Sequence, residues 1–181
     1  GSGPSGATVA KDLAKKKIKV SVLEQGRAIK NPHSSLGALP ALNLKFLSDR
    51  TALINGKGTG GSSLLYFATA AAPPKGYFEK YNINLAAYIT QAEKELPFGP
   101  LEDRLIGKRS EIIMKAANAL GYQWQKLPKI MYQDQISAGD HPFKGRWTAN
   151  DFLDEAVNNS AAVITNAWVE KVIIEKGKAL G

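Results

Sequence analysis

The sequence predicts an α/β fold with a parallel sheet, and three observations at its start carry that prediction. The opening residues Gly1-Ser2-Gly3-Pro4-Ser5-Gly6 have the G-x-G-x-x-G spacing of a turn whose backbone N–H groups close on a pyrophosphate. Helical spacing of apolar residues follows from Ala7 to Lys16, and a short apolar run follows from Ile18 to Leu23. Glu24 ends that run about 20 residues after the glycines, where an acidic group reaches ribose hydroxyls. This order of turn, helix, strand and acid indicates half of a dinucleotide-binding motif.

The three glycines of the turn have separate roles. Gly1 permits the tight turn, Gly3 lets the backbone approach the phosphates, and Gly6 lets the helix and strand pack closely. Glu24 would repel a 2′-phosphate, so we expect an adenosine ribose without one. The alternative is any parallel crossover with a glycine-rich turn and a surface glutamate at this position.

Length and composition leave room for one ordinary domain or for part of a larger protein, since the chain has 181 residues. In a doubly wound sheet the strand before the glycine turn is central, and a chain that starts at Gly1 cannot supply it. We therefore expect the chain to be an incomplete part of a longer protein. We expect no disulfides or thiolate ligands, because cysteine is missing from the composition.

The net charge of +8 comes from lysines scattered along the sequence. The densest run, Lys15 to Lys17, is explained by its position at the negative end of the first helix, so we expect no nucleic-acid partner. Runs of about 18 apolar residues, which a membrane span needs, do not occur in the sequence. We therefore expect no membrane segment in this chain. The sequence leaves the location unknown, with the cytoplasm as the default, because any signal segment would lie upstream.

A second glycine cluster, residues 56–63, follows about 30 residues that we expect to be a loop because Pro32, Gly37 and Pro40 interrupt them. This cluster, Gly-Lys-Gly-Thr-Gly-Gly-Ser-Ser, is suited to bring N–H groups against an anion or a flat polar ring. Its spacing excludes the phosphate loop of nucleotide hydrolases, because Ser62 follows Gly61 where that loop has lysine. We expect a second contact with the dinucleotide here.

The rest of the chain predicts helices and a final pair of strands. Helical patterns cover residues 85–96 and 110–120, the second with Ile112, Ile113, Ala116 and Leu120 facing inward and Gly121 as its stop. Thr148 and Asp151 are spaced as a capping pair that opens a helix through Val157. Two short strands are expected around Lys176-Gly177.

These motifs together resemble the glucose-methanol-choline (GMC) family of FAD-dependent oxidoreductases, over almost the whole chain. The resemblance rests on the glycine turn, the second glycine cluster, and the runs Val22-Leu23-Glu24-Gln25-Gly26, Arg146 to Ala156, Val169 to Ile174 and Lys178 to Gly181. One departure is Tyr66, which stands where many members have asparagine or histidine and which affects the flavin-side contact expected there.

The resemblance implies a Rossmann-like FAD-binding domain, incomplete, with the start of a substrate or cap region inserted. Residues 1–72 and 146–181 would belong to the FAD-binding domain and residues 73–145 to the insertion. The cofactor would be FAD. The residues implied to lie around it are the glycine turn with the backbone of Pro4 and Ser5 at the pyrophosphate, Glu24 at the adenosine ribose, Gly60, Gly61, Ser62 and Tyr66 near the flavin or diphosphate, and the backbone of Val169 at the adenine.

The function implied is oxidation of the CH–OH group of a small alcohol, with hydride transfer to flavin N5 and a separate electron acceptor. The family's catalytic histidine would lie beyond Gly181, so no catalytic residue is assigned here. A nicotinamide-dependent dehydrogenase and a non-catalytic nucleotide-binding module remain the alternatives.

Two local patterns favour ordinary structural roles. Tyr122 and Lys126 have the spacing of a dehydrogenase pair that must share a helical face, but Gly121 and Pro128 make a helix there unfavourable. The histidines, His33 and His141, lie in segments rich in helix breakers, and no metal site is predicted.

Overall fold

The computed structural model describes residues 1–74, 76–141 and 143–181, which form two compact units. The first unit consists of residues 1–65 and 148–181, and the second of residues 66–147.

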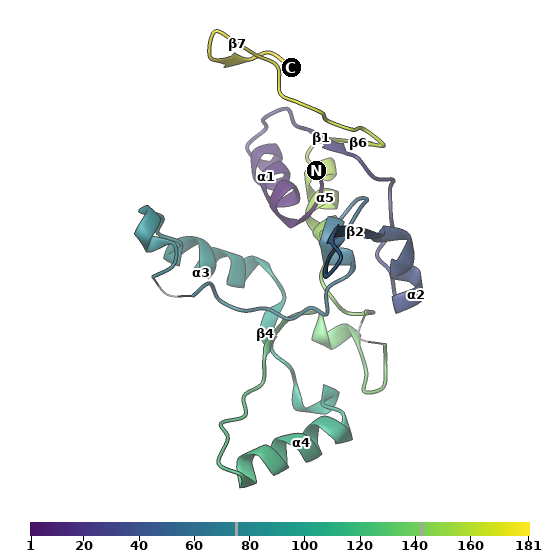
Figure 1. Cartoon of the computed structure of the whole chain (residues 1–181), viewed down its shortest axis with the longest axis vertical. Coiled ribbons are helices and arrows are strands. Elements are labelled where there is room, and N and C mark those ends of the chain that lie inside the picture. The colour runs from purple at the N-terminus through teal and green to yellow at the C-terminus, as the bar shows by residue number, and fades with distance from the viewer. Residues whose placement is uncertain (75, 142) are drawn as a thin grey trace. The chain divides into compact units, whose positions relative to one another are not determined.

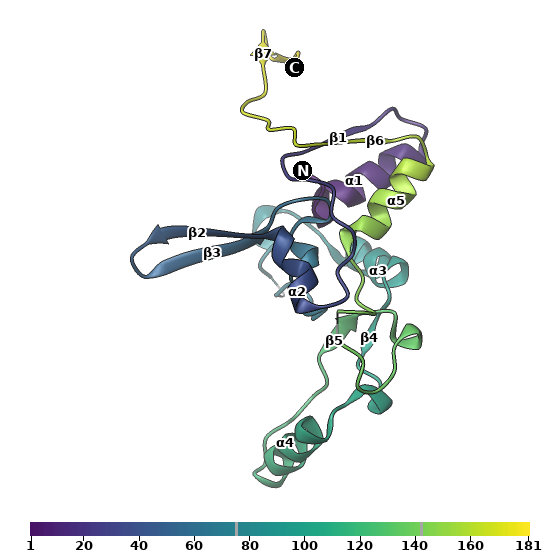
Figure 2. The same ribbon diagram turned by 90° about the vertical axis from the view of Figure 1, so that its right-hand side faces the viewer.

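The first unit is built on two parallel strands and two helices. Strand β1 (Ser21–Glu24) pairs with β6 (Ala162–Thr165), with Val22 opposite Val163 and Glu24 opposite Thr165. Helices α1 (Pro4–Lys15) and α5 (Ala149–Asn158) lie side by side (Figures 1 and 2). Their buried residues are mostly small, which allows the two backbones to approach closely; they include Ala7, Ala10, Ala14, Ala149 and Ala156. The predicted α/β class is confirmed.

Helix α1 begins at Pro4, three residues before the predicted start. Proline suits the first helical position, because its fixed φ matches the helix and the N–H group that it lacks would have no partner within the helix. Gly3 is the N-cap residue and has an extended backbone. The glycine turn therefore leads into the helix without an intervening loop.

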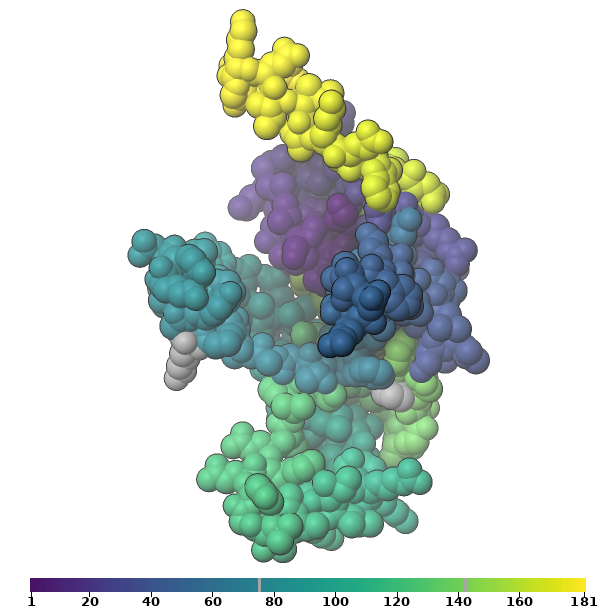
Figure 3. Space-filling model, viewed as in Figure 1, coloured from purple at the N-terminus to yellow at the C-terminus, as the bar shows by residue number. Residues whose placement is uncertain are grey.

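The prediction of a loop between Gly26 and Gly56 was wrong. After a short helix α2 (Ser35–Ala38) and a 3₁₀ turn η1 (Leu39–Ala41), the chain forms an antiparallel hairpin of β2 (Leu42–Ser48) and β3 (Thr51–Gly56). The alternation of Leu42, Leu44 and Phe46 with polar or charged residues is typical of a strand. The loop prediction gave more weight to Pro32, Gly37 and Pro40, which lie before that segment. Figure 2 shows the hairpin extending away from β1, and Figure 3 shows its blue atoms on the surface nearest the viewer.

Helix α5 begins where the Thr148 pattern predicts, but Thr148 does not make the expected cap. The Thr148 hydroxyl donates to Asn31 Oδ1 at 2.6 Å, so it is engaged away from the helix. The first helical N–H, that of Ala149, donates instead to Ser63 Oγ at 2.9 Å. A hydroxyl distant in sequence thus replaces the local cap.

Two further strands end the first unit. Strands β7 (Ile174–Glu175) and β8 (Lys178–Ala179) pair antiparallel around Lys176 and Gly177, as predicted. Lys176 and Gly177 have φ of 47° and 76°, the conformation that a two-residue hairpin turn requires.

The second unit contains helices α3 (Ala86–Glu95) and α4 (Lys108–Ala119) and an antiparallel pair of short strands, β4 (Phe98–Pro100) and β5 (Pro128–Ile130). Three 3₁₀ turns complete it: η3 (Glu79–Tyr81), η4 (Asp103–Leu105) and η5 (Gln133–Gln135). A small core of Ala68, Met131 and Ile136 packs against Tyr66 and Leu105. Both helices predicted for this region are confirmed.

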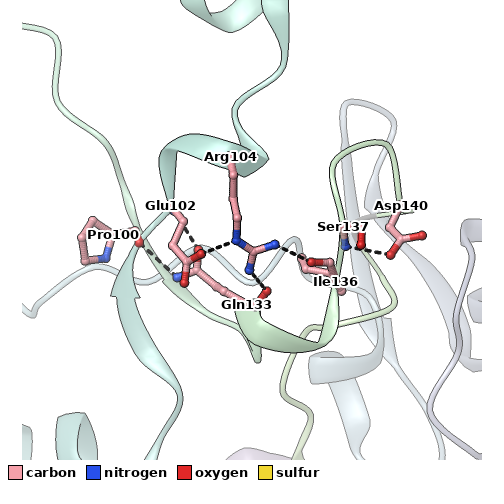
Figure 4. Close-up of polar contacts among 7 residues, drawn as sticks. All are labelled: Pro100, Glu102, Arg104, Gln133, Ile136, Ser137 and Asp140. Carbon is pink, nitrogen blue, oxygen red and sulfur yellow. Dashed lines mark hydrogen bonds and ion pairs between the residues drawn. The ribbon is translucent and has the colours of Figure 1, made fainter.

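Arg104 holds η4 and η5 together, as Figure 4 shows. Its Nε donates to Glu102 Oε2 at 2.6 Å, and its two terminal nitrogens donate to the carbonyl oxygens of Gln133 and Ile136. Gln133 also reaches back, donating from Nε2 to Pro100 O at 3.0 Å and accepting the Glu102 N–H at 2.8 Å. One guanidinium therefore bonds a carboxylate beside η4 and two carbonyl oxygens of η5 and its C-cap at the same time.

The inward face predicted for α4 was wrong. Ile112, Ile113 and Leu120 are 67%, 54% and 76% exposed, because the described residues of this unit place no element over that face.

The stretch from Tyr122 to Lys126 lies outside any helix, as predicted, and Lys126 Nζ pairs with Asp103 Oδ1 at 2.5 Å. In the described part of the chain, we find no helix with the length and apolar character of a membrane span.

Replacing Gly121 by alanine should destabilise the second unit by about 1 kcal/mol, because a side chain disfavours the left-handed backbone. Gly121 has φ of 83° and closes α4, with its N–H on Asn118 O and the next N–H, of Tyr122, on Ala117 O. An added Cβ has nothing within 4 Å at Gly121 or at Gly99, and Gly99 lacks the positive φ. Gly99→Ala is therefore the matched control, and equal unfolding free energies for the two variants in a denaturant titration would contradict the assignment.

Candidate functional site

The two glycine clusters predicted separately from the sequence meet in the first unit. A Cβ built on Gly61 would lie 2.8 Å from Gly3 Cα, closer than side chains are found in proteins. A Cβ on Gly3 would lie 3.9 Å from Gly61 Cα. The structure thus brings Gly3 and Gly61 into backbone contact, and this approach requires glycine at position 61.

The first cluster is closed on itself and leads into the N-terminus of α1. A Cβ on Gly6 would lie 1.9 Å from the carbonyl oxygen of Gly1, so no larger residue fits while this turn is kept. Among the described residues, no side chain caps the N-terminus of α1. The N–H group of Ser5, in the first turn of α1, is of the kind that binds anions, whereas Pro4 has no N–H to offer.

The second cluster has the left-handed backbone that its glycines favour. Gly58, Gly60 and Gly61 have φ of 128°, 90° and 55°, and the 3₁₀ turn η2 (Gly61–Leu64) follows. Ser62 is exposed, and its hydroxyl oxygen accepts the Gly56 N–H at 3.0 Å. Ser63 is buried; its hydroxyl donates to Gly60 O at 2.6 Å and caps α5 as described above. The cluster is thereby tied to the start of α5.

Glu24 lies between the two clusters, 5% exposed. Its Oε2 accepts the N–H of Ser2 at 2.9 Å and the hydroxyl of Ser2 at 2.7 Å. Its Oε1 accepts the N–H groups of Gly26 at 2.8 Å and Gly58 at 3.2 Å. The carboxylate therefore joins the first cluster, the end of β1 and the second cluster in one set of hydrogen bonds.

The pKa of Glu24 reflects two opposing effects. Burial acts to raise the pKa of this carboxyl, since the charged form loses water, but the hydrogen bonds from Ser2, Gly26 and Gly58 stabilise that charged form. The hydrogen bonds prevail and hold the pKa below its ordinary value of 4.5. Glu24 is therefore a carboxylate at neutral pH, able to accept hydrogen bonds but not to donate one.

A network of amides and hydroxyls around Asn31 anchors the loop that follows β1, and sequence analysis missed it. Asn31 Oδ1 accepts from Thr148 Oγ1 at 2.6 Å and from Asn150 Nδ2 at 2.9 Å. The Ile29 backbone donates to Thr59 Oγ1 at 2.8 Å and accepts from the same hydroxyl at 3.0 Å. The spacing of these residues carries no recognisable pattern, because each partner lies about thirty or more positions away.

A cavity lies beside this network, at the carboxyl end of β6. Its volume is about 500 Å³, and it is lined by residues of the loop, of α5 and of β6, among them Ile29, Thr59, Asn150, Leu153, Val163 and Thr165. Ligands of open α/β sheets bind outside the carboxyl ends of the strands, and this volume lies in the range of ligand pockets.

The remaining predicted residues are placed in different surroundings. Val169 is 55% exposed and lies in an extended segment after β6, outside any strand. Tyr66 belongs to the second unit, where its hydroxyl donates to Trp147 O at 2.8 Å. His33 and His141 are both exposed. Within the described ranges, no group of three His, Cys, Asp or Glu side chains is placed to hold a metal ion.

A dinucleotide fits the residues of the first unit in three respects. Gly1, Gly3 and Gly61 place no side chain at the start of α1, and at Gly61 a Cβ would collide with Gly3 Cα. The helix N-terminus supplies N–H groups for a pyrophosphate. The ionised Glu24 stands at the end of β1, where the ribose of a bound dinucleotide lies in such folds. The fold and site therefore define a dinucleotide-binding protein of the Rossmann type.

The comparisons with known proteins give the family. Residues 5–181 match the GMC oxidoreductases, and the chain belongs to this family of FAD-dependent oxidoreductases. It is 26% identical to long-chain-alcohol oxidase FAO1 of Arabidopsis thaliana, over 99% of this chain and 26% of that protein. An uncharacterised GMC-type oxidoreductase of Mycobacterium tuberculosis is 24% identical over all of this chain and 33% of its own length. The chain thus spans a quarter to a third of these relatives, and the family resemblance and FAD are confirmed.

The solved structures support the fold. Formate oxidase of Aspergillus oryzae, in a variant examined for FAD modification, matches with a TM-score of 0.64 at 18% identity. The match covers 97% of this chain and 39% of the formate oxidase chain. The fold of this chain is therefore the incomplete FAD-binding fold that the sequence predicted.

Glu24→Ala should weaken FAD binding by about 1 to 3 kcal/mol, the value of a hydrogen bond to a charged group. The expected role of Glu24 is to accept hydrogen bonds from the adenosine ribose. Glu155→Ala, which removes an exposed carboxylate paired with Lys15, is the control and should leave affinity unchanged. A titration of apoprotein with FAD measures both, and unchanged affinity in Glu24→Ala would remove Glu24 from the ribose site.

The lowered pKa of Glu24 also predicts how stability depends on pH. The contribution of this carboxylate is complete above the ordinary pKa of 4.5 and is lost as the pH falls through the lower pKa of the folded protein. Glu24→Gln should therefore lose less stability than the wild type between neutral pH and pH values below 4.5. Parallel acid-unfolding curves for the two proteins would show that the hydrogen bonds do not stabilise the ionised form.

Proposed function

We propose that the protein oxidises the CH–OH group of an alcohol and that this chain supplies the FAD-binding part of the active site. The observation that carries the proposal is the meeting of the two glycine clusters at Gly3 and Gly61, with Glu24 bonded to both. A single phosphate loop would need only one of these clusters. Two clusters joined by an acid match the demands of a long cofactor with two phosphates, a ribose and a ring system.

Each predicted residue has a proposed part in holding FAD. The backbone at Pro4 and Ser5 meets the pyrophosphate, and Glu24 accepts from the ribose. The second cluster, through Gly60, Gly61 and Ser62, lies toward the flavin or the diphosphate, as does Tyr66, and the Val169 backbone borders the adenine. FAD, when bound, supplies the hydride acceptor of the reaction at flavin N5.

The alcohol is the proposed donor because the relatives with named activities are long-chain-alcohol oxidases, at 26% and 25% identity. In this reaction the donor carbon loses a hydride to the flavin and the hydroxyl loses its proton to a base, so that a carbonyl product forms. The two electrons then leave to a separate acceptor. We assign no residue of this chain as the base: His141 belongs to the second unit, and His33 is an exposed residue at the cavity beside the Asn31 network.

The whole protein should lose its flavin absorbance when a primary alcohol is added without oxygen, and regain it when an acceptor is restored. A series from ethanol to dodecanol, with the matching alkanes as controls that lack the CH–OH group, identifies the donor chain length. Bleaching by NADH instead of an alcohol would favour a nicotinamide-dependent reaction, and no bleaching by any alcohol would contradict the proposal. Gly61→Ala, whose Cβ would meet Gly3 Cα at 2.8 Å, should abolish FAD binding and with it the response.

A further inference from the structure

The hydrogen bonds at Glu24 leave the carboxylate with no free position for another donor. A carboxylate offers about four lone-pair positions, two on each oxygen. The N–H and hydroxyl of Ser2 take those of Oε2, and the N–H groups of Gly26 and Gly58 take those of Oε1. A ribose hydroxyl can therefore bind Glu24 only by displacing one of these four donors.

Three of the four donors are backbone groups held by the surrounding structure. The Gly26 N–H belongs to the backbone only two residues after Glu24, so the short segment between them keeps it beside the carboxylate. Gly58 is enclosed, since a Cβ there would lie 2.5 Å from Ile29 Cδ1, and the loop is held by the Gly61 N–H, which donates to Gly58 O at 2.9 Å. The Ser2 N–H lies within the turn that Gly1 and Gly6 close. These two residues approach so closely that a Cβ built on Gly6 would lie 1.9 Å from Gly1 O.

The fourth donor, the Ser2 hydroxyl, differs because it has a second acceptor within reach. Ser2 Oγ lies 2.7 Å from Glu24 Oε2 and 3.4 Å from the carbonyl oxygen of Gly58. A hydroxyl has one proton, which it can donate to only one of them at full strength, and turning the O–H bond about Cβ–Oγ redirects that proton from one acceptor to the other. Ser2 is fully buried, so water does not compete for either acceptor.

We propose that Ser2 is a positioning residue whose hydroxyl occupies the ribose-accepting oxygen of Glu24 without the cofactor and moves to Gly58 O when FAD binds. The proposal rests on the proposed contact between Glu24 and the ribose. In the free protein the hydroxyl supplies the fourth donor to a buried charge that is otherwise bonded only to three backbone N–H groups. In the complex the ribose hydroxyl takes over that bond, and Ser2 reinforces the second glycine cluster. The hydroxyl thus stabilises the free protein and competes with FAD.

The test is a titration of the whole apoprotein with FAD, followed by flavin fluorescence, for Ser2→Ala and the wild type. We expect Ser2→Ala to bind FAD about three- to tenfold more tightly, because the competing bond is gone, with a lower melting temperature before FAD is added. Thr8→Ala is the matched control. It removes an α1 hydroxyl that donates to Pro4 O, away from Glu24, and should leave affinity unchanged.

Equal or weaker FAD binding by Ser2→Ala would overturn the exchange and make Ser2 a fixed support of the bound state. Combining Ser2→Ala with Glu24→Gln tests whether the effect of Ser2 on FAD binding depends on the carboxylate of Glu24. In Glu24→Gln the gain from Ser2→Ala should disappear, since the carboxylate for which the two hydroxyls compete is absent. A gain that persists with Glu24→Gln would overturn the proposal while leaving FAD binding and alcohol oxidation intact, because neither depends on how Ser2 turns.

Discussion

The first unit depends on one buried carboxylate. Glu24 accepts hydrogen bonds from three stretches of chain. Ser2 lies 22 residues before it, Gly26 two residues after it and Gly58 34 residues after it. Without the Glu24 carboxylate, the N–H groups of Ser2 and Gly58 would lose the acceptor that they share. Buried N–H groups without partners are costly. The contact between Gly3 and Gly61 follows from this arrangement, because both loops are held against the same side chain.

A second layer of polar contacts fixes the outer side of the second glycine cluster. Ser63 joins Gly60 to the start of α5, and Asn31 joins the loop after β1 to Thr148 and Asn150 of the same helix start. Small polar side chains suit this position, since they satisfy backbone groups of irregular loops without filling the space that a cofactor needs. The N-terminus of α5 thus serves as the frame for a cluster nearly ninety residues before it in sequence.

Sequence patterns predicted what is local and missed what is distant. The spacing of Gly1, Gly3, Gly6 and Glu24 indicated the turn, the helix and the acid, because each role depends on backbone geometry within one short unit. The Asn31 network was missed, since a single asparagine gives no signal until its partners are known. Periodicity predicted helix α4 correctly but not its exposure, as Ile112 and Ile113 show. An apolar face requires another element to cover it, and periodicity does not say whether one is present.

The chemistry of Glu24 also limits how a cofactor can enter. An ionised carboxyl that is 5% exposed retains its charge only while enough donors surround it, so partners can be exchanged but not simply removed. Backbone donors resist exchange because moving them moves the loop. A serine hydroxyl can turn within a fixed loop, and its second acceptor, Gly58 O, belongs to the second glycine cluster. In the exchange that we propose, one rotation of the Ser2 hydroxyl would free the acceptor for the ribose and strengthen the bond to the second cluster in the same step.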